Sequence, residues 1–217
     1  MESSVISMSM TSINDHPWNL WFGNLRNLKR NRIHSSITVV MIFSALVCSQ
    51  DLDAGGEMSY RNEPFPKISF KDPVSHHAMS YLGLNRRQNF SLDNMKGFFF
   101  IIEFFNTYCT SCPRDVPILN DVMTAIEQDA SLKGRVKVFG IAIGNTVREV
   151  ENYHTQHHVL FPVITDSDFT VHGALGSPRV PYTMFVKRTA RGNIVVESHQ
   201  GVLGSAEHVL KVVQSFK

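Results

Sequence analysis

The stretch EFFNTYCTSCPRDVP, from Glu103 to Pro117, constrains the fold of this chain more than any other. It begins within FFFIIEFF (residues 98–105), in which Glu103 is the one polar residue. Such an apolar run is typical of a strand that is buried on both faces of a sheet. Cys109 and Cys112 follow directly. The sequence therefore predicts a cysteine pair just beyond the end of a buried strand.

The residues after the pair predict a helix and then a second buried strand. Apolar residues recur there at helical spacing, namely Leu119, Val122, Met123 and Ile126. VKVFGIAI (136–143) is again apolar, which makes a βαβ unit with parallel strands. Beyond it we expect helices at 148–158, 168–175 and 205–216, a strand at 161–166, and a hairpin of strands 182–188 and 193–201. This order predicts an α/β sandwich on a single sheet.

The segment before the buried strand is expected to contribute further strands. FPKISF (65–70) alternates in polarity and predicts a strand. Residues 77–97 predict a strand, a turn around Gly83–Asn85 and a return strand that ends at Gly97. We therefore expect an N-terminal β-hairpin extension of the α/β domain.

Charge divides the chain into a basic leader and a neutral body. The net charge is +2, and four basic residues cluster between Arg26 and Arg32. Beyond residue 50, basic and acidic side chains are equal in number, which argues against nucleic acid as the partner. An apolar stretch, residues 37–48, follows the basic cluster, as in a secretory signal. It is short for a membrane-spanning helix, which needs ~20 residues.

These patterns predict a leader (1–50), a linker (51–64) and a domain (65–217). The domain is expected in the periplasm or another extracytoplasmic space, with membrane association through the N-terminal segment. Cleavage, retention and lipidation at Cys48 all stay open, although Val47 fits lipoprotein processing poorly. In an oxidising compartment, paired cysteines form disulfides.

The position of the cysteines predicts redox chemistry. Cys109 precedes a helix, whose free N–H groups and dipole favour a thiolate and so lower the thiol pKa. Cys112, one turn later, is expected to be more shielded and to lie within bonding reach of the first sulfur. Such a couple exchanges disulfides through a mixed-disulfide intermediate.

A metal site is the alternative use of the pair. A structural zinc usually needs four ligands, and one C-x-x-C supplies two of them. His154, His157 and His158 have helical spacing and could complete a site, although such a cluster is more often a solvated helix face. We expect neither a metal nor a bound cofactor.

IEFFNTYCTSCPRDVP resembles the active-site segment of the thioredoxin superfamily, and in particular its exported TlpA/ResA-like branch. The resemblance covers residues 65–217 and includes RVPYTMFV (179–186), which is similar to the cis-proline loop of that superfamily. It implies a thioredoxin-like sandwich with a central mixed β-sheet flanked by helices. It also implies that Cys109 is the attacking cysteine and Cys112 the resolving one.

The resemblance assigns roles to two prolines as well. Pro117 matches a proline that bends the first helix, although the helix could also begin only there. Pro181 matches the cis-proline, which would leave the backbone of Val180 free to pair with a bound peptide. From the residues alone, Pro181 could be a proline at the start of a strand.

Glu103 matches the buried acid that thioredoxin carries below its disulfide. Burial would raise its pKa, so that it could take the thiol proton of the resolving cysteine. The alternative is a glutamate at a strand end that reaches solvent. Asp115 stands where relatives often carry glutamate, and Tyr108 replaces the usual tryptophan. We expect Tyr108, Thr110 and Ser111 beside the bound substrate, together with Val180.

The implied function is thiol–disulfide exchange on protein substrates, as a reductant fed by a membrane thiol electron donor. Apocytochromes before haem attachment are one implied substrate, through cytochrome c maturation. Two alternatives remain, a copper- or zinc-binding module and a thiol peroxidase of the same fold. The peroxidase needs a proline three residues before Thr107, and this chain has Phe104 there.

Overall fold

A computed structural model describes residues 59–71 and 75–216 of this chain, which belong to one compact unit, Gly55–Lys217. The predicted leader with its apolar stretch 37–48, and residues 51–58 of the predicted linker, lie outside the described residues. None of the helices in the described part is long and apolar enough to cross a membrane.

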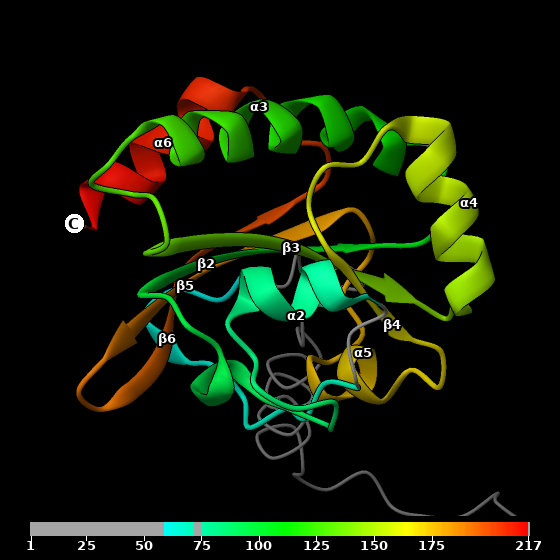
Figure 1. The fold of residues 1–217 in the computed structure, drawn as a ribbon, viewed down its shortest axis with the longest axis horizontal. Coiled ribbons are helices and arrows are strands. Elements are labelled where there is room, and N and C mark those ends of the chain that lie inside the picture. Colours follow the sequence, from blue (N-terminus) through cyan, green and yellow to red (C-terminus); the bar gives the residue numbers. More distant parts are fainter. Residues whose placement is uncertain (1–58, 72–74, 217) are drawn as a thin grey trace, which may run out of the picture. The chain divides into compact units, whose positions relative to one another are not determined.

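The centre of the domain is a six-stranded mixed sheet with the order β1-β6-β5-β2-β3-β4 (Figure 1). Its central strands, β2 (Phe99–Phe105) and β3 (Val136–Ile143), are parallel and buried along their whole length. This confirms the βαβ unit predicted from the two apolar runs. β4 (Val163–Asp166) is parallel to β3, whereas β5 (Tyr182–Thr189) is antiparallel to β2.

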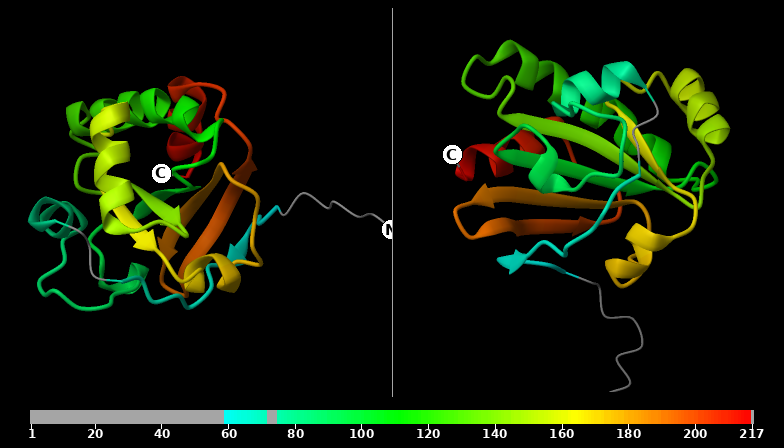
Figure 2. Two further views of the ribbon diagram at one scale, coloured as in Figure 1. Left: turned by 90° about the vertical axis from the view of Figure 1, so that its right-hand side faces the viewer. Right: turned by 60° about the horizontal axis from the view of Figure 1, so that its bottom comes forward.

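Helices cover both faces of the sheet, as Figures 1 and 2 show. One core lies between the sheet and three helices, α3 (Asp115–Gln128), α4 (Val147–His157) and α6 (Ala206–Ser215). The other core contains residues of α2 (His76–Leu82), of the short 3-10 helix η1 (Leu92–Asn94) and of α5 (Thr170–Ala174). The predicted helices and the C-terminal hairpin, β5 with β6 (Gly192–Gln200), are confirmed.

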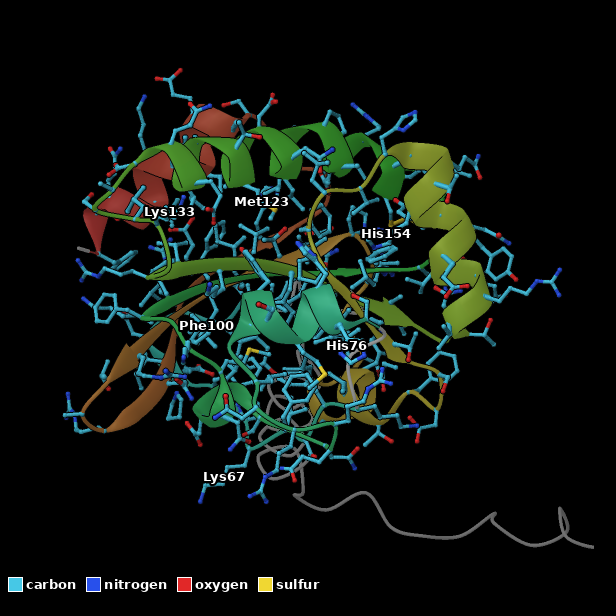
Figure 3. The ribbon with its side chains drawn as sticks, in the orientation of Figure 1. Lys67, His76, Phe100, Met123, Lys133 and His154 are labelled. Atoms are coloured by element: carbon cyan, nitrogen blue, oxygen red, sulfur yellow. A yellow bond between two sulfur atoms is a disulfide. The ribbon has the colours of Figure 1, made fainter. Side chains whose placement is uncertain are left out.

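The predicted N-terminal β-hairpin is wrong. Residues 76–82 form the helix α2, which begins at His76 (Figure 3). Ser75 caps α2 by accepting a hydrogen bond from the Ala78 N–H, and Gly83 ends it with a left-handed conformation (φ 72°). A seven-residue helix has too few turns to display the helical period in its sequence, so this segment is not distinguished from a strand by its pattern.

The predicted strand at residues 65–70 is also wrong in most of its length. Phe70 forms one antiparallel bridge to Phe90, and the Phe65 N–H donates to the Asn193 carbonyl, but no strand runs through residues 65–70. The strand of this region is instead β1 (Glu63–Pro64), which lies in the predicted linker and pairs with the edge of β6.

Candidate active site

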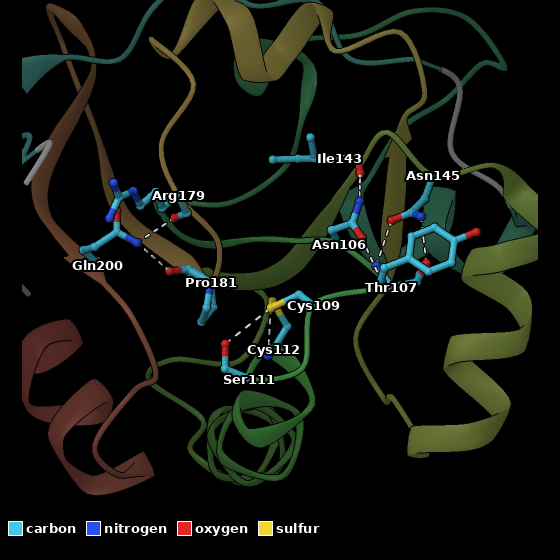
Figure 4. The surroundings of a disulfide bond; sticks show 11 residues. Asn106, Thr107, Cys109, Ser111, Cys112, Ile143, Asn145, Arg179, Pro181 and Gln200 are labelled. Atoms are coloured by element: carbon cyan, nitrogen blue, oxygen red, sulfur yellow. Dashed lines mark hydrogen bonds between the residues drawn. A yellow bond between two sulfur atoms is a disulfide. The ribbon is translucent and has the colours of Figure 1, made fainter. Parts of the chain in front are cut away.

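The cysteine pair lies where β2 ends and the next helical turn begins. Two asparagines hold the loop between β2 and this helical turn through hydrogen bonds (Figure 4). Asn106 donates to the Ile143 carbonyl over 2.6 Å, and its side-chain oxygen accepts from the Tyr108 N–H. Asn145, fully buried, accepts from the Thr107 N–H and donates to the Thr107 hydroxyl. The ends of β2 and β3 thus hold the backbone that leads to Cys109.

Cys109 and Cys112 form a disulfide, with 5.5 Å between their Cα atoms. This confirms that the two sulfurs lie within bonding reach. Cys112 begins the 3-10 helix η2 (Cys112–Arg114), which continues into α3. Its backbone N–H donates to the Cys109 sulfur over 3.1 Å, and the Ser111 hydroxyl lies 3.4 Å from the same sulfur. Cys112 is 2% exposed and Cys109 is half-buried, so Cys109 is the sulfur that a partner reaches first.

The Pro181 loop lies beside the disulfide (Figure 4). The Val180–Pro181 peptide bond is cis. Gln200 on β6 holds this loop, because its side-chain amide donates to the carbonyls of Arg179 and Pro181. Val180 is half-buried and packs against both hydrophobic cores, and Cys109 packs against one of them.

The other residues expected beside a substrate differ in exposure. Tyr108 is 75% exposed, and its hydroxyl donates to the carboxylate of Glu149 on α4. Thr110 is exposed and Ser111 is half-buried against the sulfur. Glu149 also caps α4 at Thr146. The Thr146 backbone N–H donates to the Glu149 carboxylate. This hydrogen bond first, and then the one from the Tyr108 hydroxyl, lower the pKa of Glu149 to about 2.

Glu103 is buried inside the domain, 3% exposed, rather than at a solvated strand end. It lies on the face of β2 that packs against α3, because Phe99, Ile101 and Phe105 on the same face belong to that core. The Thr183 hydroxyl donates to one carboxyl oxygen over 2.6 Å, and the other oxygen has no partner among the described residues. Burial first, and then the charge of Asp115, raise the pKa of Glu103 well above its usual 4.5.

Asp115 is a site residue whose importance the sequence did not reveal. It is the first residue of α3, three residues after Cys112 and therefore one helical turn away. It is 1% exposed, and one of its oxygens accepts the Leu203 N–H over 2.7 Å. Burial raises its pKa, although the Leu203 hydrogen bond acts in the opposite direction. Its spacing from the buried Leu119 and Val122 would have placed it on the inner face of the helix.

Pro117 is the third residue of α3, in its first turn. A backbone N–H in the first turn of a helix has no carbonyl partner within that helix, so the helix loses no hydrogen bond because proline lacks this group. The helical backbone already begins at Cys112 as η2, so the α-helix does not begin at Pro117.

The histidines considered for a metal site point to different surroundings. His154 (Figure 3) lines a pocket of about 440 Å³, His157 packs on the Tyr153 ring, and His158 ends α4 with a left-handed backbone. Among the described residues, no three His, Cys, Asp or Glu side chains lie together so that they could hold a metal ion. Phe104, at the position of the peroxidase proline, is buried in the core on the opposite face of β2.

A mixed sheet of this order with a C-x-x-C disulfide between a central strand and its helix defines a thioredoxin-fold protein with a redox-capable cysteine pair. A model of the AhpC/TSA family matches residues 65–203. The chain belongs to the AhpC/TSA family.

Similar proteins agree with this class. The thiol-disulfide oxidoreductase ResA of Bacillus anthracis is 22% identical over 165 residues, which are 76% of this chain and 87% of that protein. ResA of Geobacillus thermodenitrificans is 23% identical over 96 residues, 44% of this chain and only about half (51%) of that protein. The crystal structure of a DsbF homologue from Corynebacterium diphtheriae superposes with a TM-score of 0.53 at 18% identity, over 74% of this chain and 94% of the other. The chain therefore stands in the TlpA/ResA-like part of the thioredoxin superfamily, among thiol–disulfide oxidoreductases.

Proposed function

We propose that this protein catalyses thiol–disulfide exchange on protein substrates outside the cytoplasm, with Cys109 as the attacking cysteine and Cys112 as the resolving one. The observation that carries the proposal is the asymmetry of the pair. The half-buried Cys109 sulfur accepts the Cys112 N–H, whereas the Cys112 sulfur is enclosed. In the dithiol form the same N–H and the start of the helix favour a thiolate at Cys109.

In the proposed reaction the Cys109 thiolate attacks a substrate disulfide. A Cys109–substrate disulfide forms, and the other substrate sulfur leaves with the electron pair. Cys112 then loses its proton and attacks the Cys109 sulfur. The Cys109–Cys112 disulfide forms, the second substrate thiolate leaves, and the two electrons of the dithiol have passed to the substrate. Glu103, buried with a raised pKa, assists the proton transfer from Cys112.

The surface around Cys109 suits an extended protein segment. We expect the backbone of Val180 to pair with a bound chain, because Gln200 holds the carbonyls of its neighbours Arg179 and Pro181. Tyr108, adjacent to Cys109 in the chain, offers an exposed aromatic ring, and Thr110 and Ser111 belong to the same turn. These contacts would select a strand-like segment that contains a cysteine.

The direction and the place of the reaction follow from the family resemblance and from the basic and apolar pattern of the leader. We propose a reductant in an extracytoplasmic space, reached through the N-terminal segment and re-reduced by a membrane thiol donor. Apocytochromes before haem attachment are the proposed substrate class, because their haem-binding cysteines must be reduced.

The test is an insulin-reduction assay on the full-length protein with dithiothreitol as the electron source. Wild type is expected to reduce insulin, and Cys109→Ser to be inactive. Cys112→Ser is expected to accumulate a covalent mixed disulfide on Cys109, visible in a non-reducing gel. Cys48→Ser is the matched control, because it removes the one cysteine outside the pair.

Two results would overturn the proposal. One is stoichiometric copper or zinc in the purified protein together with no exchange activity, which would favour the metal-binding module. The other is peroxide consumption that depends on Cys109 and exceeds disulfide exchange, which would favour the peroxidase. If the protein does exchange disulfides, capture of the natural substrate on Cys112→Ser in its own cell would name the partner.

A further inference from the structure

A polar row crosses the face of the sheet below the cysteines. In the strand register Glu103 on β2 lies opposite Thr183 on β5, and Thr183 lies opposite His199 on β6. Residues that lie opposite each other in neighbouring strands point to the same face of a sheet. All three side chains therefore face the side of the sheet on which an apolar core packs under α3 and α6. A row of polar residues in such a core calls for a reason beyond packing.

Asp115 enters the same core from the start of α3. It leaves one carboxyl oxygen without a hydrogen-bond partner among the described residues, and Glu103 does the same. Buried carboxyl oxygens without partners are costly. The two groups are close enough for the Asp115 charge to raise the pKa of Glu103. A single proton held between the two carboxyl groups would satisfy both unpaired oxygens.

His199 connects this core with solvent. It is half-buried, and one ring nitrogen lies 3.1 Å from the Val202 carbonyl, which can only accept. The ring therefore donates from that nitrogen, which leaves the other one for proton exchange. A positive charge on His199 favours the ionised form of Asp115 and so lowers its pKa.

The other groups that face this unit do not replace His199. Arg114 also favours ionised Asp115, but its side chain is exposed. Tyr153, on α4, is buried, and its pKa is raised by burial and by the charges of Glu103 and Asp115. A neutral phenol therefore borders the carboxyl pair, and His199 is the half-buried cation of this set whose charge acts on Asp115.

We propose that Glu103, Asp115 and His199 form one proton-handling unit, in which the two carboxyl groups share a single proton and His199 keeps Asp115 as the ionised member. The inference rests on the proposed function. During resolution the Cys112 thiol gives its proton to the Asp115 carboxylate, one turn away. The Cys112 sulfur bonds to the Cys109 sulfur, and the substrate sulfur leaves with the electron pair and takes a proton from solvent. His199 is a positioning residue that acts through Asp115, and the pair then loses the proton it received to solvent.

The coupling is tested by carbon-13 NMR titration of the side-chain carboxyl groups in the oxidised full-length protein. Asp115→Asn is expected to lower the titration midpoint of Glu103 by about one pH unit or more. His199→Gln is expected to raise the midpoint of Asp115. Asp121→Asn and His208→Gln change the same residue types on exposed surfaces of α3 and α6, and should leave both midpoints unchanged. An unchanged Glu103 midpoint in Asp115→Asn together with an unchanged Asp115 midpoint in His199→Gln would overturn the proposal.

The kinetic test separates the two chemical steps. In single-turnover reduction of a disulfide peptide, Asp115→Asn should form the mixed disulfide at the wild-type rate and resolve it about 100-fold more slowly near pH 7. His199→Gln should shift the pH profile of resolution rather than its plateau. Equal slowing of both steps would indicate a purely structural role and refute the proposal.

The titration needs no exchange activity, so it can succeed or fail independently of the proposed function. Should Asp115→Asn not fold, the wild-type titration decides. A shared proton requires two well-separated steps for the pair, and two independent single steps would refute it.

Discussion

The replacement of Glu103 by Gln tests the burial of the acid through the pH dependence of stability. In the native protein Glu103 keeps its proton above pH 4.5, because burial and the Asp115 charge raise its pKa. The unfolded chain releases that proton near 4.5. Between these two pKa values the native state binds more protons than the unfolded state, so the free energy of unfolding falls as pH rises.

The size of the effect follows from the one proton involved. Within that window Glu103 lowers the free energy of unfolding by up to about 1.4 kcal/mol per pH unit. Gln has the shape of a protonated Glu, and its amide oxygen can still accept the Thr183 hydroxyl. Glu103→Gln is therefore expected to match wild type near pH 4 to 5, about the unperturbed pKa, and to be the more stable protein at alkaline pH.

Urea unfolding of the oxidised protein at several pH values measures this slope. Glu151→Gln, at an exposed position of α4, is the matched control and should keep the wild-type slope. Parallel stability curves for wild type and Glu103→Gln would show that Glu103 titrates as an ordinary acid, and would refute the argument for its burial as a neutral group.

Three further substitutions test the framework of the site by urea unfolding. Asn145→Ala is expected to cost about 1–3 kcal/mol, because it leaves two half-buried hydrogen-bonding groups of Thr107 without their buried partner, and to speed hydrogen exchange of the Thr107 amide; slow exchange would contradict this. Gly140→Ala should cost about 1–3 kcal/mol, since its Cβ would lie 2.9 Å from the Phe105 ring; a stabilised variant would count against the packing described. Ser205→Ala removes the N-cap of α6 and should cost about 1 kcal/mol, with Ser205→Asp restoring it; failure of that rescue would argue against capping.

The central elements could be predicted because their sequence pattern is local. A run of apolar residues indicates burial on both faces from the residues of the strand alone, without knowledge of which segments pack on it. The predicted bounds of β2 and β3 therefore agree with the structure to within a residue. The helix expected at 205–216 likewise begins where predicted, with Ser205 as the N-cap of α6. The helix α2 was missed although Ser75 and Gly83 carry capping signals. Its placement depends on tertiary contacts, such as the hydrogen bond from the Val138 N–H to the Tyr81 hydroxyl.

The sequence by itself determined that two cysteines stand one helical turn apart, directly after a buried strand, because both facts depend on residues close together in the chain. Only the tertiary structure decided which groups lie below the disulfide. The strand order β6-β5-β2 and the packing of α3 on one face of these strands bring four residues together, namely Glu103, Asp115, Thr183 and His199. Strand register depends on pairing between segments far apart in the chain, and no local pattern encodes it.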